Sequence, residues 1–270
     1  MTENLPFPYP KFDAKEDAEK IIKWIKDWFD LNGPTANAII GISGGKDSTI
    51  AAGLCVKALG KDRVIGVLMP NGIQPDIDDA LRVVKTLGIK YRIVNINFGY
   101  ISLIDAITYD DEDSDTNFEL SVTDALKQNL PPRLRMATLY AIAQGVENGG
   151  RVVNTCNRSE DYVGYSTKYG DSAGDLSPLG SYTVKEVLAI GDYLNILPND
   201  LVHKAPSDGL CGLTDEDNLG FSYEMLDKYI MTGKCEDESV RAKIDRLHNI
   251  NLHKVSPMPM VDRMWKESKW

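Results

Sequence analysis

The residues most suited to chemistry form a short turn after an apolar run that begins at Asn37, and they read Gly41-Ile42-Ser43-Gly44-Gly45-Lys46-Asp47-Ser48. The paired glycines let the backbone turn tightly and bring its amides close to a ligand. A helix predicted to begin at about Lys46 directs its N-terminal amides to the same place, which favours an anion. Asp47 is a carboxylate within this phosphate site, and it is compatible there mainly with a divalent metal ion in between. The sequence therefore predicts a nucleotide pyrophosphate loop.

Two other phosphate-binding motifs do not fit this stretch. The Walker A motif needs glycine at position 40 and a hydroxyl residue after Lys46, whereas the chain has Ile40 and Asp47. The dinucleotide motif G-x-G-x-x-G does not occur here either. A plain turn between a strand and a helix would explain the two glycines, but not the serines and the aspartate around them.

The elements around this loop alternate between apolar runs typical of buried strands and segments with helical spacing of apolar residues. Strands are predicted from 37, over 63–69, 90–95 and 151–154, and helices over 14–31, 46–59, 76–87, 131–147, 183–194, 222–232 and 236–249. This order predicts an α/β fold with a doubly wound, mostly parallel sheet and helices on both faces. Ligands of such sheets bind at the carboxyl ends of the strands, where the loop lies. We expect a single domain over 1–270.

Composition limits the class of protein. The chain has 40 acidic and 30 basic side chains and a net charge of -10, which argues against nucleic acid as its main partner. Its four cysteines form no C-x-x-C pair, which disfavours a zinc site, and scattered thiols suit a reducing cytoplasm. The first residues lack the apolar core of a signal peptide, and no run is long enough to span a bilayer. We expect a cytoplasmic protein with no membrane partner.

Three polar stretches have no periodicity. The acidic run over 110–115 lacks the glycine and the closing glutamate of a calcium loop and is predicted to be a solvated surface loop. The stretches over 164–180 and 207–220 are rich in glycine and polar residues. A structureless stretch of this length inside a compact domain predicts a mobile functional loop, which we expect for 164–180.

Further segments accompany the loop and carry a resemblance. They are Thr155-Cys156-Asn157-Arg158-Ser159-Glu160, Ser166-Thr167-Lys168-Tyr169-Gly170-Asp171 with Asp175 and Ser177-Pro178-Leu179 downstream, and Leu252-His253-Lys254. The motif S-G-G-x-D-S resembles the signature of the ATP pyrophosphatases. The whole combination, from about 15 to 256, resembles ammonia-dependent NAD synthetases. The resemblance implies amidation of deamido-NAD with ammonia through an adenylated intermediate, giving NAD, AMP and pyrophosphate.

The resemblance also implies roles for single residues. Residues of the loop from Gly41 to Ser48, with Thr155 and Ser207, would bind ATP, and Asp47 and Glu160 would hold Mg²⁺. The residues implied to bind deamido-NAD are Arg133, Lys168, Asp175, His253 and Lys254. A lysine that many members use for the ATP phosphates is Val184 here, and we expect Lys185, one residue on, to take its place. We expect Lys168 and Asp171 to be catalytic, because ammonia must react as NH₃ and a carboxylate such as Asp171 can bind ammonium and take its proton.

Each assignment has a structural alternative. Arg133 would be an exposed residue at a helix start, Glu160 a first-turn acid stabilised by the helix dipole, and His253 a surface histidine. Two other functions also stay open: a tRNA-modifying enzyme with the same ATP motif, and a non-catalytic ATP sensor. The family is typically homodimeric, and the apolar stripe of the first helix (Trp24, Trp28, Phe29) suits either a dimer interface or the core.

Overall fold

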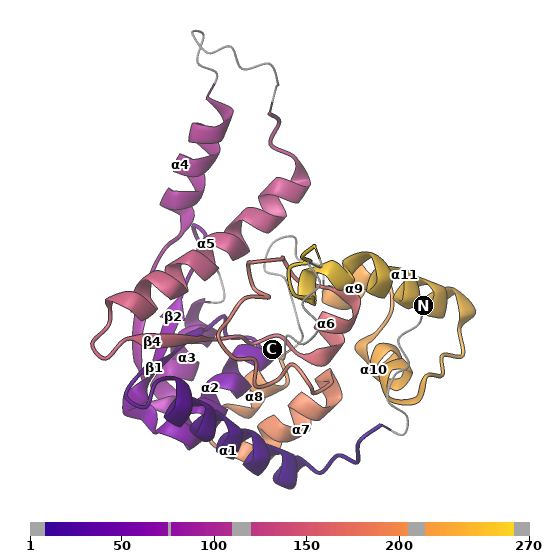
Figure 1. The fold of residues 1–270 in the computed structure, drawn as a ribbon, viewed down its shortest axis with the longest axis horizontal. Coiled ribbons are helices and arrows are strands. Elements are labelled where there is room, and N and C mark those ends of the chain that lie inside the picture. The colour runs from indigo at the N-terminus through magenta and orange to yellow at the C-terminus, as the bar shows by residue number, and fades with distance from the viewer. Residues whose placement is uncertain (1–8, 75–76, 110–119, 205–213, 262–270) are drawn as a thin grey trace.

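The computed structural model describes residues 9–74, 77–109, 120–204 and 214–261 (Figure 1). Its sheet contains β1 (Asn37–Gly41), β2 (Val64–Leu68), β3 (Lys90–Ile93) and β4 (Gly150–Val153), in the order β3-β2-β1-β4. All three neighbouring pairs are parallel. Because the chain moves outward from β1 to β3 and then returns to place β4 on the other side of β1, the strand order reverses between β1 and β4. Ligands of such sheets bind at this reversal.

Helices form most of the remaining described structure. Their bounds are α1 (Ala14–Asn32), α2 (Lys46–Leu59), α3 (Ile77–Leu87), α4 (Asn97–Thr108), α5 (Asp124–Gly145), α6 (Arg158–Val163), α7 (Val184–Leu194), α8 (Asn199–Val202), α9 (Asp215–Leu219), α10 (Tyr223–Thr232) and α11 (Glu238–Val255), with a 3₁₀ turn at Lys61–Arg63. No helix in these described ranges is both long and apolar enough to cross a bilayer.

The two faces of the sheet are covered by different helices. Alternate residues of a strand point to opposite faces, and accordingly Ile40 packs into one hydrophobic cluster and Ile39 into another. The cluster around Ile40 joins the sheet to α1, α2, α3, α7 and α8, and the cluster around Ile39 joins it to α5. The predicted doubly wound architecture with helices on both faces is confirmed.

A smaller hydrophobic cluster lies beside the sheet. It gathers apolar side chains of α6, α10 and α11, among them Val163, Leu226, Ile230 and Ile244. Val184 at the start of α7 belongs to this cluster, while Val187 one turn later packs in the main core. Helix α7 therefore connects the two cores, and we refer to the smaller one as the lateral cluster.

The stripe of the first helix is mostly core. Ala18, Ile21, Ile25 and Phe29 are buried in the cluster shared with α2 and α7. Trp28 packs partly against the same cluster, whereas Trp24 is 43% exposed. The core alternative is therefore correct for most of this stripe.

Two helix predictions need correction, and helix α4 was not predicted. Helix α5 begins at Asp124, not at Pro131, because the Thr123 side chain caps the helix by accepting a hydrogen bond from the Leu126 amide. Pro131 and Pro132 lie inside the helix, where they remove amide donors without ending it. Helix α11 continues past Asn249 to Val255, so His253 and Lys254 lie in its last turn.

Candidate functional site

The predicted phosphate loop connects β1 to α2 at the carboxyl end of the strand. Gly44 has a φ of +82°, which favours glycine, and it packs against the start of α3. The hydroxyls of Ser43 and Ser48 lie 3.1 Å apart, and the Gly45 amide donates to Ser43 Oγ. Helix α2 begins at Lys46 with no side chain capping it. Its first amides are therefore available to an anion.

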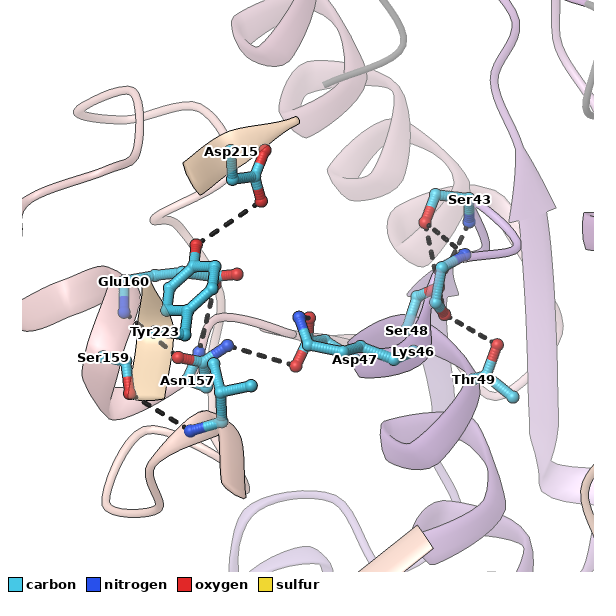
Figure 2. A network of polar contacts seen from close by, with 12 residues as sticks. Ser43, Lys46, Asp47, Ser48, Thr49, Asn157, Ser159, Glu160, Asp215 and Tyr223 are labelled. Atoms are coloured by element: carbon cyan, nitrogen blue, oxygen red, sulfur yellow. Dashed lines mark hydrogen bonds and ion pairs between the residues drawn. The ribbon is translucent and has the colours of Figure 1, made fainter. Parts of the chain in front are cut away.

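Lys46, Asp47 and Asn157 form a polar contact across the edge of the sheet (Figure 2). The Lys46 ammonium lies 2.7 Å from Asp47 Oδ2, and Asn157 Nδ2 donates to Asp47 Oδ1 at 3.1 Å. Lys46 is only 4% exposed. Burial alone would lower its pKa, but the charges of Asp47 and Glu160 outweigh burial and raise the pKa of Lys46. We therefore infer that this buried lysine carries its charge.

Glu160 lies in the first turn of α6, where it contacts Asn157, the partner of Asp47. Asn157 and Glu160 form a capping box, in which each side chain accepts from the backbone amide of the other. Burial, and then the nearby charge of Asp47, raise the pKa of Glu160 well above its usual value. Asn157 thus donates to both carboxylates, through its side-chain amide to Asp47 and through its backbone amide to Glu160. Among the described residues, no group of three or more histidine, cysteine, aspartate or glutamate side chains is arranged to hold a metal ion.

The segment after β4 connects the phosphate loop to the second predicted motif. Asn157 contacts Asp47 as described, while Asn154 Nδ2 and Cys156 Sγ donate to the backbone carbonyl of Asp171, at 2.8 and 3.3 Å. Thr155, predicted to contact ATP, lies between these residues. The segment 154–157 therefore brings the two motifs together.

Asp171 is solvent-exposed as a residue, but its carboxylate is held by the backbone of its own segment. The Thr167 amide donates to its Oδ1 at 2.7 Å. Burial raises the pKa of Asp171, and the hydrogen bond from Thr167 and the charges of Lys254 and Arg135 oppose this rise. A carboxylate with a raised pKa, held near basic groups, is suited to taking a proton.

The basic residues predicted to bind deamido-NAD form one cluster. Lys168 Nζ donates to the carbonyl of His253 at 2.7 Å, and Arg133 Nε donates to the carbonyl of Lys168 at 3.3 Å. Lys254 Nζ donates to the carbonyl of Gly164 at 2.8 Å. Residues from α5, the 164–180 segment and the end of α11 thus meet, and we refer to Arg133, Lys168, His253 and Lys254 as the basic cluster.

The remaining predicted residues are placed differently. Asp175 accepts from the Val152 amide of β4 at 2.7 Å, so its carboxylate is bound to the sheet and not to the basic cluster. Val184 and Lys185 both line a cavity of about 670 Å³ that Lys46 and Tyr223 also line. Lys185 therefore faces the same space as the phosphate loop. Ser207, the acidic run 110–115 and most of the polar stretch 207–220 lie outside the described residues.

Sequence reasoning missed several residues of the site. The Asn157 amide was detectable, since asparagine three residues before glutamate at a helix start is a capping-box pattern. Tyr223, whose hydroxyl donates to Asp215 Oδ2 at 3.4 Å near Lys46, had no sequence signal (Figure 2). Neither did Arg135, which interacts with Asp171 and donates to the Met69 carbonyl.

Comparisons with known proteins agree with this geometry. The family model described as NAD synthase matches residues 18–269. The NH(3)-dependent NAD(+) synthetase of Alkaliphilus metalliredigens is 36% identical over 254 residues, which cover 90% of this chain and 97% of that protein. The corresponding protein of Finegoldia magna is 40% identical over 215 residues, covering 79% and 83%.

Solved structures show the same fold. NMN synthetase from Francisella tularensis superposes with a TM-score of 0.80 at 33% identity, covering 94% of this chain and all of that one. NH3-dependent NAD synthetase from Campylobacter jejuni superposes with a TM-score of 0.71 at 28% identity, covering 93% and 100%.

Proposed function

The chain belongs to the NAD synthase family and catalyses ammonia-dependent NAD synthesis as a C–N ligase, and from that premise we propose a role for each residue of the site. The acceptor is deamido-NAD, which ATP activates by adenylation and ammonia then converts to the amide. One observation carries the proposal most strongly. Segment 154–157 contacts both Asp47 of the phosphate loop and Asp171 near the basic cluster, so ATP and the acceptor would meet beside it.

The ATP half of the site would be the loop from Gly41 to Ser48, with Thr155, Ser207 and Lys185. The uncapped start of α2 supplies amides for the phosphates, and Ser43 and Ser48 supply hydroxyls. Lys46 and Lys185 line the adjoining cavity, and their ammonium groups suit the charge of a pyrophosphate.

Asp47 and Glu160 would hold Mg²⁺. Proteins usually bind this ion through one or two carboxylates together with substrate phosphates, and these two carboxylates converge on Asn157 beside the phosphate loop. The donor set therefore fits the ion. Bound there, Mg²⁺ would supply neutralisation of the charge that develops on the phosphates.

The acceptor half would be the basic cluster. Its four basic side chains suit a molecule that carries both a pyrophosphate and a carboxylate. The nicotinate carboxylate would attack the α-phosphorus of ATP, forming an acyl–phosphate bond and releasing pyrophosphate. Lys168 would help to orient that carboxylate. Asp175 would bind deamido-NAD from its position beside β4.

In the second step, ammonia would attack the acyl carbon and AMP would leave. The nucleophile must be NH₃, so a group that binds ammonium and takes its proton is needed. Asp171 would do this, since it lies next to the segment 154–157 and desolvation of its carboxylate raises its pKa. The segment 164–180 would exclude water, which otherwise hydrolyses the intermediate.

Product analysis tests this function. Purified protein with ATP, Mg²⁺, deamido-NAD and ammonium chloride should give NAD, AMP and pyrophosphate in equal amounts, and glutamine should replace ammonium poorly. Binding of ATP without formation of NAD would contradict the proposal.

A second acceptor follows from one comparison. The protein from Francisella tularensis with TM-score 0.80 is an NMN synthetase. Its likeness favours testing the acid form of that mononucleotide as an alternative acceptor. The two acceptors should be compared by kcat/KM in the same assay. A higher value for the mononucleotide would reverse the assignment of deamido-NAD.

Lys185 is expected to bind the ATP phosphates in place of a lysine at 184. Replacing it with methionine should raise the KM for ATP by about tenfold or more, because a hydrogen bond to a charged group is lost. Steady-state kinetics at varied ATP measure this. Lys57→Met is the matched control, since Lys57 is exposed on α2 away from the cavity. An unchanged KM in Lys185→Met would show that the position has no phosphate contact.

The protein is also proposed to be a homodimer, with α4 in its interface. This helix has no buried residue and projects with the start of α5 beyond the sheet (Figure 1). Phe98 is 79% exposed and Ile101 47% exposed. Short helices are marginal in water without tertiary packing, so an apolar helix of this kind favours a partner copy.

Light scattering after gel filtration tests the dimer. Phe98→Asp with Ile101→Asp should shift the protein from dimer to monomer, because each charge would be buried unpaired in the interface. Ile73→Asp is the control, since Ile73 is 99% exposed outside the helix. A wild type that is monomeric at micromolar concentration would contradict the proposal.

A further inference from the structure

The Lys46 side chain stands at the variable position of S-G-G-x-D-S. This side chain is 4% exposed, and its ammonium lies near acidic groups from three parts of the chain. Asp47 is 2.7 Å away, and Glu160 and Asp215 act on it through their charges. The ring of Tyr223 lies beneath it, with the ammonium 5.6 Å from the ring centre. The two carboxylates proposed to bind a divalent ion, Asp47 and Glu160, thus already lie near a cation, the Lys46 ammonium.

The oxygens of Asp47 are both in use. Lys46 contacts Oδ2 and Asn157 Nδ2 donates to Oδ1. A divalent cation approaching Asp47 would meet a positive charge within about 3 Å of the oxygen that it needs. Repulsion between a single and a double charge at such distances strongly opposes binding even at an effective dielectric constant of about 20.

The same side chain also borders open space. Lys46 lines the cavity of about 670 Å³ together with Lys185 and Tyr223. A lysine ammonium is carried on a flexible stem of four carbons, so it can turn towards this cavity while α2 stays in place. ATP phosphates bound at the start of α2 would attract it and would also supply oxygens for the metal ion.

We propose that the Lys46 ammonium is a built-in counter-ion of the Asp47–Glu160 pair, which excludes divalent cations from the free enzyme and moves to the phosphates when ATP binds. The metal ion would then enter with the nucleotide and not before it. This inference rests on the proposed metal role of Asp47 and Glu160. It adds a specific function for the lysine, which sets the order in which metal and nucleotide bind.

Binding of Mn²⁺ to the nucleotide-free protein tests this role. The signal of free Mn²⁺ in electron paramagnetic resonance measures binding without any turnover. Lys46→Gln should bind Mn²⁺ at least about tenfold more tightly than the wild type, because a positive charge leaves the site. Lys46→Arg keeps the charge and should resemble the wild type. Adding Asp47→Asn to Lys46→Gln should abolish the gain.

Equal Mn²⁺ affinity in the wild type and Lys46→Gln, with the variant folded by circular dichroism, would overturn the inference. The wild type provides an independent arm should Lys46→Gln fail to fold. The inference would also be overturned if the nucleotide-free wild type bound Mn²⁺ as tightly as free ATP binds Mn²⁺ and if Asp47→Asn abolished that binding. Either result leaves the proposed reaction intact if NAD still forms, so failure of the inference and of the function are distinguishable.

Discussion

Replacing Gly44 with alanine is expected to lower kcat/KM for ATP by about 100-fold. Gly44 has a φ of +82°, and a Cβ there would lie 2.8 Å from the Ala80 amide nitrogen and 2.9 Å from Asp79 Cβ at the start of α3. The backbone of α3 is held by the main core and cannot yield, so the loop must shift. A displacement of about 1 Å in a catalytic site is sufficient for a loss of this size.

Gly60→Ala is the matched control for this experiment. Gly60 has nearly the same φ, +81°, but a Cβ there would meet nothing within 4 Å. With a ψ of 152°, Gly60 lies in a region nearly restricted to glycine, so alanine there should cost about 1–3 kcal/mol of stability from backbone strain and leave the kinetics unchanged. Steady-state kinetics and thermal unfolding on both variants separate strain from crowding. Equal activity in the two variants would show that the loop tolerates the shift.

Replacing Asp171 with asparagine is expected to lower the rate of amide formation by about 10² or more, the usual contribution of a general base. Asparagine retains an oxygen that can accept from the Thr167 amide, so the local structure should persist. The adenylation step does not need this base. Exchange of labelled pyrophosphate into ATP in the presence of deamido-NAD should therefore continue while NAD formation falls.

The same residue predicts a pH dependence. Burial raises the pKa of Asp171, so its basic form is lost as the pH falls through that raised value. In the wild type, kcat/KM for ammonium should fall on the acidic side for this reason in addition to the titration of ammonium itself. Asp171→Asn should show only the latter.

Asp161 is the informative comparison for this profile. Burial, and then the charge of Asp171, raise the pKa of Asp161 to about 6. If Asp161→Asn removed the acidic limb and Asp171→Asn did not, the base would be Asp161.

The sequence was sufficient for the sheet and for the phosphate loop, because both depend on local patterns. Apolar runs defined the strands, and two glycines with flanking hydroxyls defined the turn at Ser43. The sequence was insufficient where contacts between distant segments determine the structure. Helix α4 lies on no part of the described core, so its apolar residues lacked the periodicity of a packed face. The prolines of α5 indicated a helix start at Pro131, whereas the helix begins after its cap at Thr123.

In the site, too, contacts between distant segments could not be predicted from local patterns. Arg133, Lys168, His253 and Lys254 were predicted only through resemblance, and the structure brings them together from three separate segments. No spacing rule could bring the Lys46 ammonium near the charge of Glu160 and the ring of Tyr223, since these groups belong to α2, α6 and α10. Asp175 was predicted with the acceptor residues, and its observed bond to β4 depends on a strand pairing that the local sequence does not encode.

The two carboxylates proposed to hold Mg²⁺ do not share one core. Asp47 is carried by α2, which is anchored in the main core, whereas Glu160 and Tyr223 belong to elements of the lateral cluster. The lateral cluster is the smaller of the two and has less apolar surface to hold it together. On warming, it would loosen first and carry Glu160 away from Asp47 while the sheet is still intact. Heat would then inactivate the enzyme below the temperature at which most of its secondary structure melts.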